Sequence, residues 1–325
     1  MFQVASHPTN FPVHHAVWQH DDLSPVTSPT RSSFSSADVQ LPRTLQRPSY
    51  SEVSRDQIAA VAPELVDVPA EYIRRSICAK TNQYVFVQIQ RQKLPKINLA
   101  FRMLAGISAL SKSHLPVTIP KSHLRHNTPL TVPIRTSPSQ PTPSYPTHFL
   151  ALSTNTKSQT SSSDQLPLVP THSLVLAAHC AALPRMPAST PQPQGSTVTI
   201  PVLPLAVPSP QAFQTLHQFL YTHNVATLLH SLLPSLPSTF LATLSSSTIH
   251  ATLASGPKLH QLSSHCLSNA QHGQPTQILM GHAHHITALW RNVIALGVHD
   301  KDLWDAIDLA WEIILGSLNL AAGVH

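Results

Sequence analysis

Proline residues restrict where regular structure can form in this chain. The 325 residues include 31 Pro but only 8 Gly. A proline inside a helix or a central strand removes a backbone hydrogen bond. Helices are therefore confined to the stretches that prolines leave free, whereas Pro-rich stretches are typical of loops and unfolded segments. Because 42% of the residues are apolar, we expect folded regions with their own core, joined by Pro-rich connections.

The stretch VPSPQAFQTLHQFLYTHN, residues 207–224, predicts a well-formed helix. Ser209 suits the N-cap, and Pro210 suits the first helical position, where its missing N–H costs nothing. Its apolar face would be formed by Phe213, Leu216, Phe219 and Leu220. A helix this short gains little stability alone, so we expect it to pack against the helix predicted over residues 174–183.

Residues 276–322 predict an antiparallel pair of helices joined by the sequence GVH. Gly297 suits the end of the first helix, and Asp300 suits the N-cap of the second. One apolar face is predicted to contain Ile278, Ile286, Leu289, Val293 and Leu296, and the facing one Leu303, Ile307, Ala310, Ile314 and Leu318. These faces indicate a helical hairpin that buries its own core.

Acidic residues are unevenly placed along the chain. Asp164 is the one acidic residue between Tyr72 and His299, whereas the second C-terminal helix carries several. At 100° per residue, its acids gather on one side of the helix. The candidate interaction surface consists of Trp304, Asp305, Asp308 and Glu312. Two interpretations stay open, a solvated helix face or a contact for a basic partner.

The predicted fold class is α+β, with a small mixed module followed by the helical hairpin. Strands are expected over residues 147–153 and 196–203, because these runs are β-branched and apolar. The expected organisation is a disordered tail over residues 1–55, a helical segment over 56–110, a Pro-rich linker over 111–146, the mixed module over 147–240, a linker with short helices over 241–275, and the hairpin over 276–322. The stretch 82–98 resembles an insertion, either a real short strand or translated intron.

Catalytic and cofactor patterns are not found in the sequence. The central part has no pair of carboxylates for acid–base catalysis, and no GxSxG, GxGxxG or GxxxxGK motif occurs. Cys78, Cys180 and Cys266 are too few and too widely spaced for a disulfide framework, so we expect reduced thiols. The chain is therefore predicted not to be an enzyme, and a hydrolase is a distant alternative.

Histidine is abundant, with 22 residues, but its spacing does not match a known metal motif. The densest group is His282, His284 and His285, of which only the first and third share a helical face. His172 and His179 are interpreted as packing residues. No metal or other cofactor is predicted.

The net charge of +6 and the pI near 9.4 permit acidic partners without demonstrating any. The best basic cluster lies in residues 74–102, where aromatic residues alternate with Arg and Lys. Direct nucleic-acid binding through this segment is the alternative function, less favoured because no zinc finger or helix-turn-helix accompanies it. No signal peptide or membrane-spanning run is identified.

The stretches PTHSLVLAAHCAALP and STVTIPVLPLAVPSPQAFQTLHQFLYT resemble a degenerate BTB/POZ domain. The residues that occupy the places of its core are His172, Leu174, Leu176, Phe213, Leu216, Phe219, Leu220 and Tyr221. The sequence departs from that pattern at other positions, since Cys180 stands near the usual Ser, His223 replaces the usual Gly, and a Pro-rich loop occupies residues 184–193. The resemblance implies a protein-interaction module, and the sequence leaves its oligomeric state open.

Over residues 60–322 apart from 82–98, the chain is similar to the fungal clampless protein family. The residues that carry the similarity include SYPTHFLALS, VPTHSLVLAAHCAALP and LWRNVIALGVHDKDLWDAIDLAWEIILGSLNLA. The similarity implies a non-enzymatic regulator of sexual development that controls clamp-cell formation and dikaryon growth downstream of mating-type genes. It further implies protein partners, among them transcription factors of the mating pathway, and a location in the nucleus, with the cytoplasm as the alternative.

Overall fold

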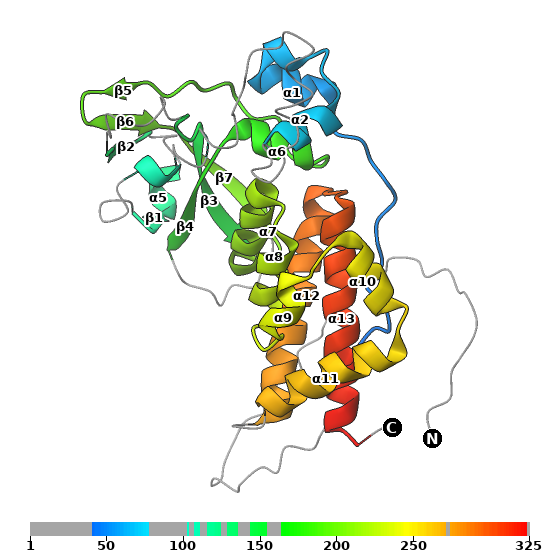
Figure 1. The fold of residues 1–325 in the computed structure, drawn as a ribbon. Coiled ribbons are helices and arrows are strands. Elements are labelled where there is room, and N and C mark those ends of the chain that lie inside the picture. Colours follow the sequence, from blue (N-terminus) through cyan, green and yellow to red (C-terminus); the bar gives the residue numbers. More distant parts are fainter. Residues whose placement is uncertain are drawn as a thin grey trace, which may run out of the picture. The chain divides into compact units, whose positions relative to one another are not determined.

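The computed structural model describes residues 41–77, 103, 107–110, 116–124, 129–135, 144–154, 164–270 and 274–323. Residues Arg43–His325 form one unit, in which two sheets lie at the end of a helical bundle (Figure 1). Mixed α and β structure agrees with the predicted α+β class. Within the described part of the chain, none of the helices has the length and apolar character needed to span a membrane.

The larger sheet has the strand order β1-β4-β3-β7. Its strands are β1 (Thr118–Pro120), β4 (Gln165–Thr171), β3 (His148–Thr154) and β7 (Val202–Val207). Strand β3 is parallel to β7 and antiparallel to β4. The smaller sheet, of order β2-β6-β5, contains β2 (Leu130–Pro133), β6 (Thr197–Ile200) and β5 (Pro193–Gln194). A shared core of Phe149, Val198, Ile200 and their neighbours holds the two sheets together.

Strand β4 contains Pro167 and Pro170 although it lies between two other strands. Pro167 is paired with β1 at Thr118, and Pro170 is paired with β3 at Phe149. Because β1 pairs with residues 165–167 and β3 with residues 168–171, each proline needs backbone pairing on one side only.

Helix α6 (Ser173–His179) follows β4 and is buried along its whole length. Its N-cap is His172, whose side chain makes no capping hydrogen bond. Thr147 Oγ1 instead accepts a hydrogen bond from Ser173 N at 2.7 Å. Helices α1 (Arg55–Val61) and α2 (Ala70–Ile77) pack against α6, with the short 3₁₀ helix Pro63–Leu65 between them.

Helix α7 (Pro210–Thr222) is the helix predicted from residues 207–224. Ser209 Oγ accepts a hydrogen bond from Ala212 N, and Pro210 begins the helix, as predicted. Its apolar face, which consists of Phe213, Leu216, Phe219 and Leu220, is at most 2% exposed. The helix contacts α6, as expected, and also packs against β3, α8 (Val225–Leu232) and α12 (Pro275–Leu296). The partner helix α12 was not anticipated from the sequence.

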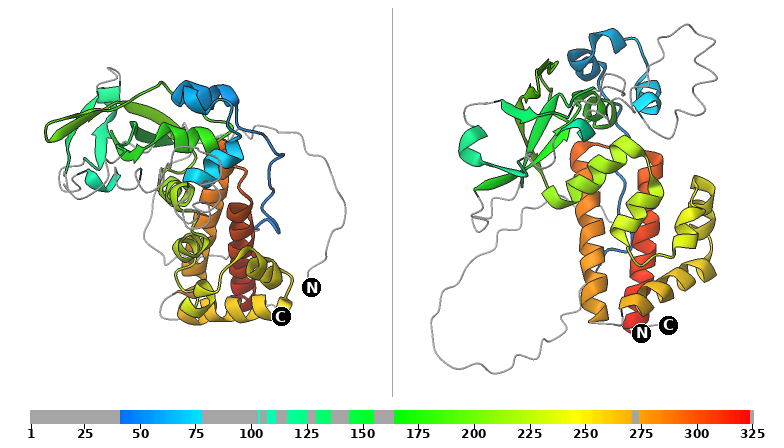
Figure 2. Two further views of the ribbon diagram at one scale, coloured as in Figure 1. Left: turned by 45° about the horizontal axis from the view of Figure 1, so that its top comes forward. Right: turned by 60° about the vertical axis from the view of Figure 1, so that its left-hand side comes forward.

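The C-terminal hairpin is confirmed as α12 and α13 (Lys301–Ala321), which lie side by side in Figures 1 and 2. Gly297 ends α12 in the left-handed conformation, and Asp300 caps α13 by accepting from Leu303 N. Helices α9 (Ser238–Ala242), α10 (Ser246–Leu253) and α11 (Gly256–Ala270) precede the hairpin. Both α10 and α11 pack against α13, which is therefore buried on more sides than a two-helix hairpin requires.

Three expectations differ from the structure. The Pro-rich stretch 111–146, expected to be a linker, contributes β1, β2 and the short helix α5 (Lys121–Leu124). In the predicted tail 1–55, the chain is already docked from Arg43 onwards, while residues 1–40 lie outside the described part. Ile278 was placed on the apolar face of α12 but is 42% exposed. The insertion-like stretch 82–98 lies outside the described residues.

The turn between α12 and α13 packs directly against the chain after α6. Ala181 N and Ala182 N donate to Gly297 O and Leu296 O at 3.1 and 3.0 Å. A Cβ on Gly297 would lie 2.9 Å from Ala182 N, and Gly297 has a φ of +64°. Glycine is therefore required both by the backbone conformation and by this close approach.

We expect Gly297→Ala to lower the free energy of unfolding by more than Gly195→Ala. Both glycines have positive φ, but nothing lies within 4 Å of a Cβ on Gly195. The backbone conformation alone costs about 1–2 kcal/mol in each case, and the contact with Ala182 adds to the cost at Gly297. Urea denaturation of the two variants measures the difference, and equal losses would contradict the importance of this contact.

Candidate functional site

The predicted acidic surface of α13 is occupied by a segment from the other end of the chain, residues 43–47. Arg47 Nη2 donates to Asp305 Oδ1 at 2.9 Å, and Arg47 Nε donates to Asp308 Oδ2 at 3.1 Å. Arg43 pairs with Glu312 at 3.4 Å. The three predicted acids thus share two arginines that lie four residues apart.

Apolar and backbone contacts also hold segment 43–47 in place. Leu45 is 5% exposed, and Trp290 Nε1 donates to Gln46 O at 2.9 Å. The guanidinium of Arg47 lies 5.9 Å from the ring centroid of Trp304, within the range of a cation–π contact. Segment 43–47, which bends at residues 43 and 44 and has no regular secondary structure, is therefore held through charge, ring and backbone interactions together.

Asp305 is the centre of this surface, and its side chain is only 3% exposed. Besides Arg47, its carboxylate contacts Lys301 Nζ and His250 Nε2, the latter at 3.2 Å. Burial by itself would raise the pKa of Asp305, but hydrogen bonds from Lys301 and Arg47 outweigh burial and lower this pKa. The carboxylate is therefore ionised at neutral pH, and it stabilises the surrounding cations.

The structure brings the four predicted surface residues together and buries two of them. Trp304 and Asp305 are 3% and 2% exposed, and Trp304 Nε1 donates to Val298 O at 3.0 Å. The side chains of Asp308 and Glu312 stay partly exposed, and all three acids contact arginines of the same chain. Sequence reasoning missed Arg43 and Arg47, because the Pro/Ser-rich surroundings of LPRTLQRP indicated a tail. No local signal marks them, because the spacing of arginines along a non-helical segment does not correspond to the spacing of acids along a helix.

The predicted BTB-like core residues are all buried and lie where α6 meets α7. Tyr221 Oη accepts a hydrogen bond from His172 N at 2.8 Å and lies 3.0 Å from His172 Nδ1. His172 Nε2 lies 2.9 Å from Ser144 O. Burial lowers the pKa of His172 to about 4 and raises that of Tyr221 to about 12. Both side chains are therefore neutral at pH 7, as packing residues with satisfied hydrogen bonds.

A second polar cluster joins α6, α7 and α13 through His179, His223 and Asp300. One possible ligand atom from each residue lies within 4.8 Å of the other two. His223 Nδ1 lies 3.3 Å from Asp300 Oδ2. The Nε2 atoms of both histidines are buried without a hydrogen-bond partner in the protein. The expectation that His179 serves only for packing leaves these nitrogens unexplained.

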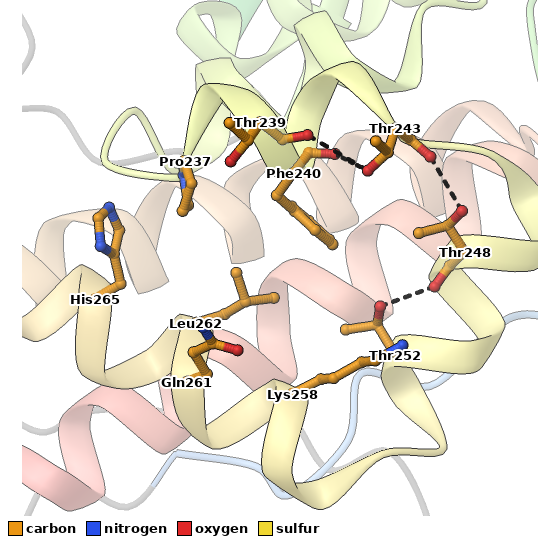
Figure 3. Close-up of a pocket in the computed structure, with 10 residues that line it drawn as sticks. All are labelled: Pro237, Thr239, Phe240, Thr243, Thr248, Thr252, Lys258, Gln261, Leu262 and His265. Carbon is orange, nitrogen blue, oxygen red and sulfur yellow. Dashed lines mark hydrogen bonds between the residues drawn. The ribbon is translucent and has the colours of Figure 1, made fainter.

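A groove of about 400 Å³ lies between α9, α10 and α11. Phe240 and Leu262 point into it, and threonines line one side (Figure 3). The hydroxyls of Thr248 and Thr252 donate to carbonyls of the main chain at 3.0 and 2.8 Å. The described lining contains no carboxylate, and its ionisable side chains are Lys258 and His265.

Two models of one family match the chain over most of its length. The N-terminal domain of clampless protein 1 matches residues 48–208, and its C-terminal domain matches residues 226–325. The chain belongs to the clampless protein family. Membership indicates a role in clamp-cell formation. No curated protein and no solved structure shows significant similarity to the chain.

The two clampless domains divide the structure between the sheets and the helices. The N-terminal match includes both sheets and α6, and the C-terminal match includes α9 to α13. Helix α7 lies between the two matched ranges and packs against elements of both, α6 and α12. The predicted module 147–240 crosses this boundary, and its BTB/POZ identity stays a prediction.

The alternative nucleic-acid segment, residues 74–102, is described only at Arg74–Ile77. Arg74 Nε donates to Ala178 O at 2.7 Å, and Arg75 Nε donates to Glu71 Oε1 at 3.1 Å. Both arginines therefore have protein partners. The rest of the segment, like Cys78, lies outside the described residues, and nucleic-acid binding stays a prediction.

Proposed function

We propose that this protein is a non-enzymatic regulator of fungal sexual development that acts by binding other proteins. In this proposal it controls clamp-cell formation and dikaryon growth downstream of mating-type genes. Its partners are proteins of the mating pathway, transcription factors among them, and it works in the nucleus. Two domain matches to clampless protein 1 support the developmental part of the proposal.

The observation that carries the binding part is the docking of segment 43–47 on α13. A non-helical segment with two arginines is held there by Asp305, Asp308 and Glu312. A surface that holds such a segment within its own chain has the charge pattern to hold a similar one from a partner. We therefore assign the face of α13 to an arginine-bearing, non-helical segment of a partner protein, which competes with segment 43–47.

Replacing the arginines tests the competition. The probe is a labelled peptide with the sequence of residues 41–53, LPRTLQRPSYSEV. We expect the double variant Arg43→Gln/Arg47→Gln to bind it at least about 10-fold more tightly than the wild type, whose own segment occupies the site. Adding Asp308→Asn to the double variant should remove the binding, because Asp308 is one of the two carboxylates that bind Arg47. Asp308 is chosen because it is the less buried of the two. Asp302→Asn, on the same helix but away from the segment, is the matched control.

The same carboxylate variants test the function in cells. The gene is replaced by Asp308→Asn/Glu312→Gln, and mating cultures are scored for clamp cells. We expect clamp cells to be lost while the protein level matches that of the Asp302→Asn strain. Normal clamp formation in the double variant, together with failure of the peptide to bind, would overturn the assignment of α13 as the binding face.

A further inference from the structure

We propose that His179, His223 and Asp300 form a binding site for a divalent transition-metal ion, of which zinc is the best-suited example. Two imidazoles and one carboxylate make up a common protein ligand set for zinc, with a water in the fourth position. The three residues come from the last turn of α6, the C-cap of α7 and the N-cap of α13. They lie far apart in the sequence, which explains why no motif revealed the site.

The geometry fits a tetrahedral ion after a small contraction. Zinc binds nitrogen and oxygen at about 2.0–2.2 Å, so neighbouring ligand atoms lie about 3.4 Å apart. His223 Nδ1 and Asp300 Oδ2, at 3.3 Å, already have that spacing. No pair of the three ligand atoms exceeds 4.8 Å, so side-chain rotations can close the remaining gaps.

One buried nitrogen points to a ligand at this place. The whole residue His179 is only 3% exposed, and its Nε2 has no hydrogen-bond partner in the protein. A buried polar atom without a partner costs about 1–3 kcal/mol, and a bound cation would remove that cost.

The backbone at His223 adds a second, independent indication. His223 has a φ of 44°, and it is the one described residue other than glycine with positive φ. Glycine occupies this conformation without strain, and it is the usual residue at the end of a helix like α7. A side chain kept at a position that favours glycine is consistent with a function for that side chain.

The charges around the site are mixed, and they favour a cation overall. The electrostatic potential at His223 has negative contributions from the carboxylates of Asp300, Asp302 and Glu71. The guanidinium of Arg74 makes a positive contribution. Arg74 is held by Ala178 O and Glu71. The side chains of His223 and Asp300 are 15% and 16% exposed, which leaves an entry path.

The position of the site gives the ion a structural role. His179 lies in the matched N-terminal clampless domain, Asp300 lies in the C-terminal one, and His223 lies between the two matches. An ion bound to all three would connect the two domains beside the Gly297 turn. Ala181 and Ala182 of the chain after α6 already donate hydrogen bonds to this turn. Binding would therefore raise the stability of both domains at once.

The test uses the full-length protein, stripped with a chelator and then dialysed against micromolar zinc chloride. We expect one zinc ion per chain by elemental analysis and a rise in Tm on zinc addition. Cobalt(II) substitution should give the intense visible absorption of a tetrahedral site. His223→Gly should lose zinc affinity by at least about 100-fold while remaining folded, because glycine suits φ 44°. His179→Gln should lose it to a similar extent.

A matched control separates this site from surface histidines. His282→Ala/His285→Ala removes the pair that shares a face of α12, and we expect it to bind zinc like the wild type. The proposal is overturned if folded wild-type protein retains no zinc, if His223→Gly and His179→Gln retain it fully, or if the ion is lost only in the α12 control. Asp300→Asn, which keeps an oxygen to accept from Leu303 N, gives a further variant that should stay folded.

Discussion

Acidification from pH 7 to pH 4 is expected to destabilise this protein by several kcal/mol, through histidines that are buried without charge. Burial lowers the pKa of His148 and His172 from 6.5 to about 4, and that of His217 to about 3. In the unfolded chain these rings take up a proton near pH 6.5, whereas in the folded protein they stay neutral until pH 4 or below. Stability is therefore full above pH 6.5 and is lost progressively as the pH falls toward 4.

The size of this loss follows from the pKa shifts. One pKa unit corresponds to about 1.4 kcal/mol, so His172 alone accounts for about 3 kcal/mol at pH 4. Its ring is 1% exposed and has Tyr221 and Ser144 as partners, so solvent does not screen the effect. Urea denaturation at pH 7, 6, 5 and 4 measures the slope of the free energy of unfolding against pH.

His148→Asn tests whether the buried rings cause this slope. Asparagine keeps the contact that His148 Nδ1 makes with Thr147 Oγ1 at 2.9 Å, and it removes the Nε2 that has no partner. We expect the free energy of unfolding of this variant to change less steeply with pH between 6.5 and 4. The difference in slope should correspond to the uptake of about one proton on unfolding. The exposed His265→Asn is the control and should keep the wild-type slope. A slope unchanged in His148→Asn would show that this ring does not contribute.

Phe213→Ala is expected to lower the free energy of unfolding by about 3–5 kcal/mol, the range for large core side chains. Phe213 is 0% exposed on α7, the helix that contacts both the α6 region and α12. Removing its ring leaves a cavity at the place where the two clampless domains meet. Thermal or urea unfolding at pH 7 gives the measurement.

Two companion variants identify the cause of that loss. Phe213→Leu keeps most of the apolar volume and should cost less than half as much. Gln214→Ala, on the exposed side of the same helix, should change stability by no more than about 0.5 kcal/mol. A loss below 1 kcal/mol in Phe213→Ala would contradict the central position of α7.

Local sequence patterns predicted the helices whose ends have specific chemistry. Ser209 and Pro210 begin α7, Gly297 ends α12 and Asp300 begins α13, as their side chains or backbone preferences require. The strand expected over residues 147–153 corresponds to β3. These features depend on a few neighbouring residues, so the sequence can specify them directly.

Contacts between distant segments could not be predicted in this way, because they depend on residues that lie far apart in the sequence. Residues 118–120 and 130–133 of a Pro-rich stretch form strands because their partners, residues 165–167 and 197–200, supply the hydrogen bonds. Likewise, the sequence around Arg47 indicates a tail, and only the folded chain places Asp305 and Asp308 beside this arginine. Neither partner can be identified from local propensity.

The sequence by itself determined the N-caps of α7 and α13, the glycine that ends α12, the apolar faces of α7 and α13, and the family. The tertiary structure alone decided that the acidic face of α13 holds segment 43–47, and that His179, His223 and Asp300 meet. The reason is that caps and faces follow from a repeat of a few residues along one helix. The two clusters arise where three elements converge, so their composition depends on the packing of the whole chain.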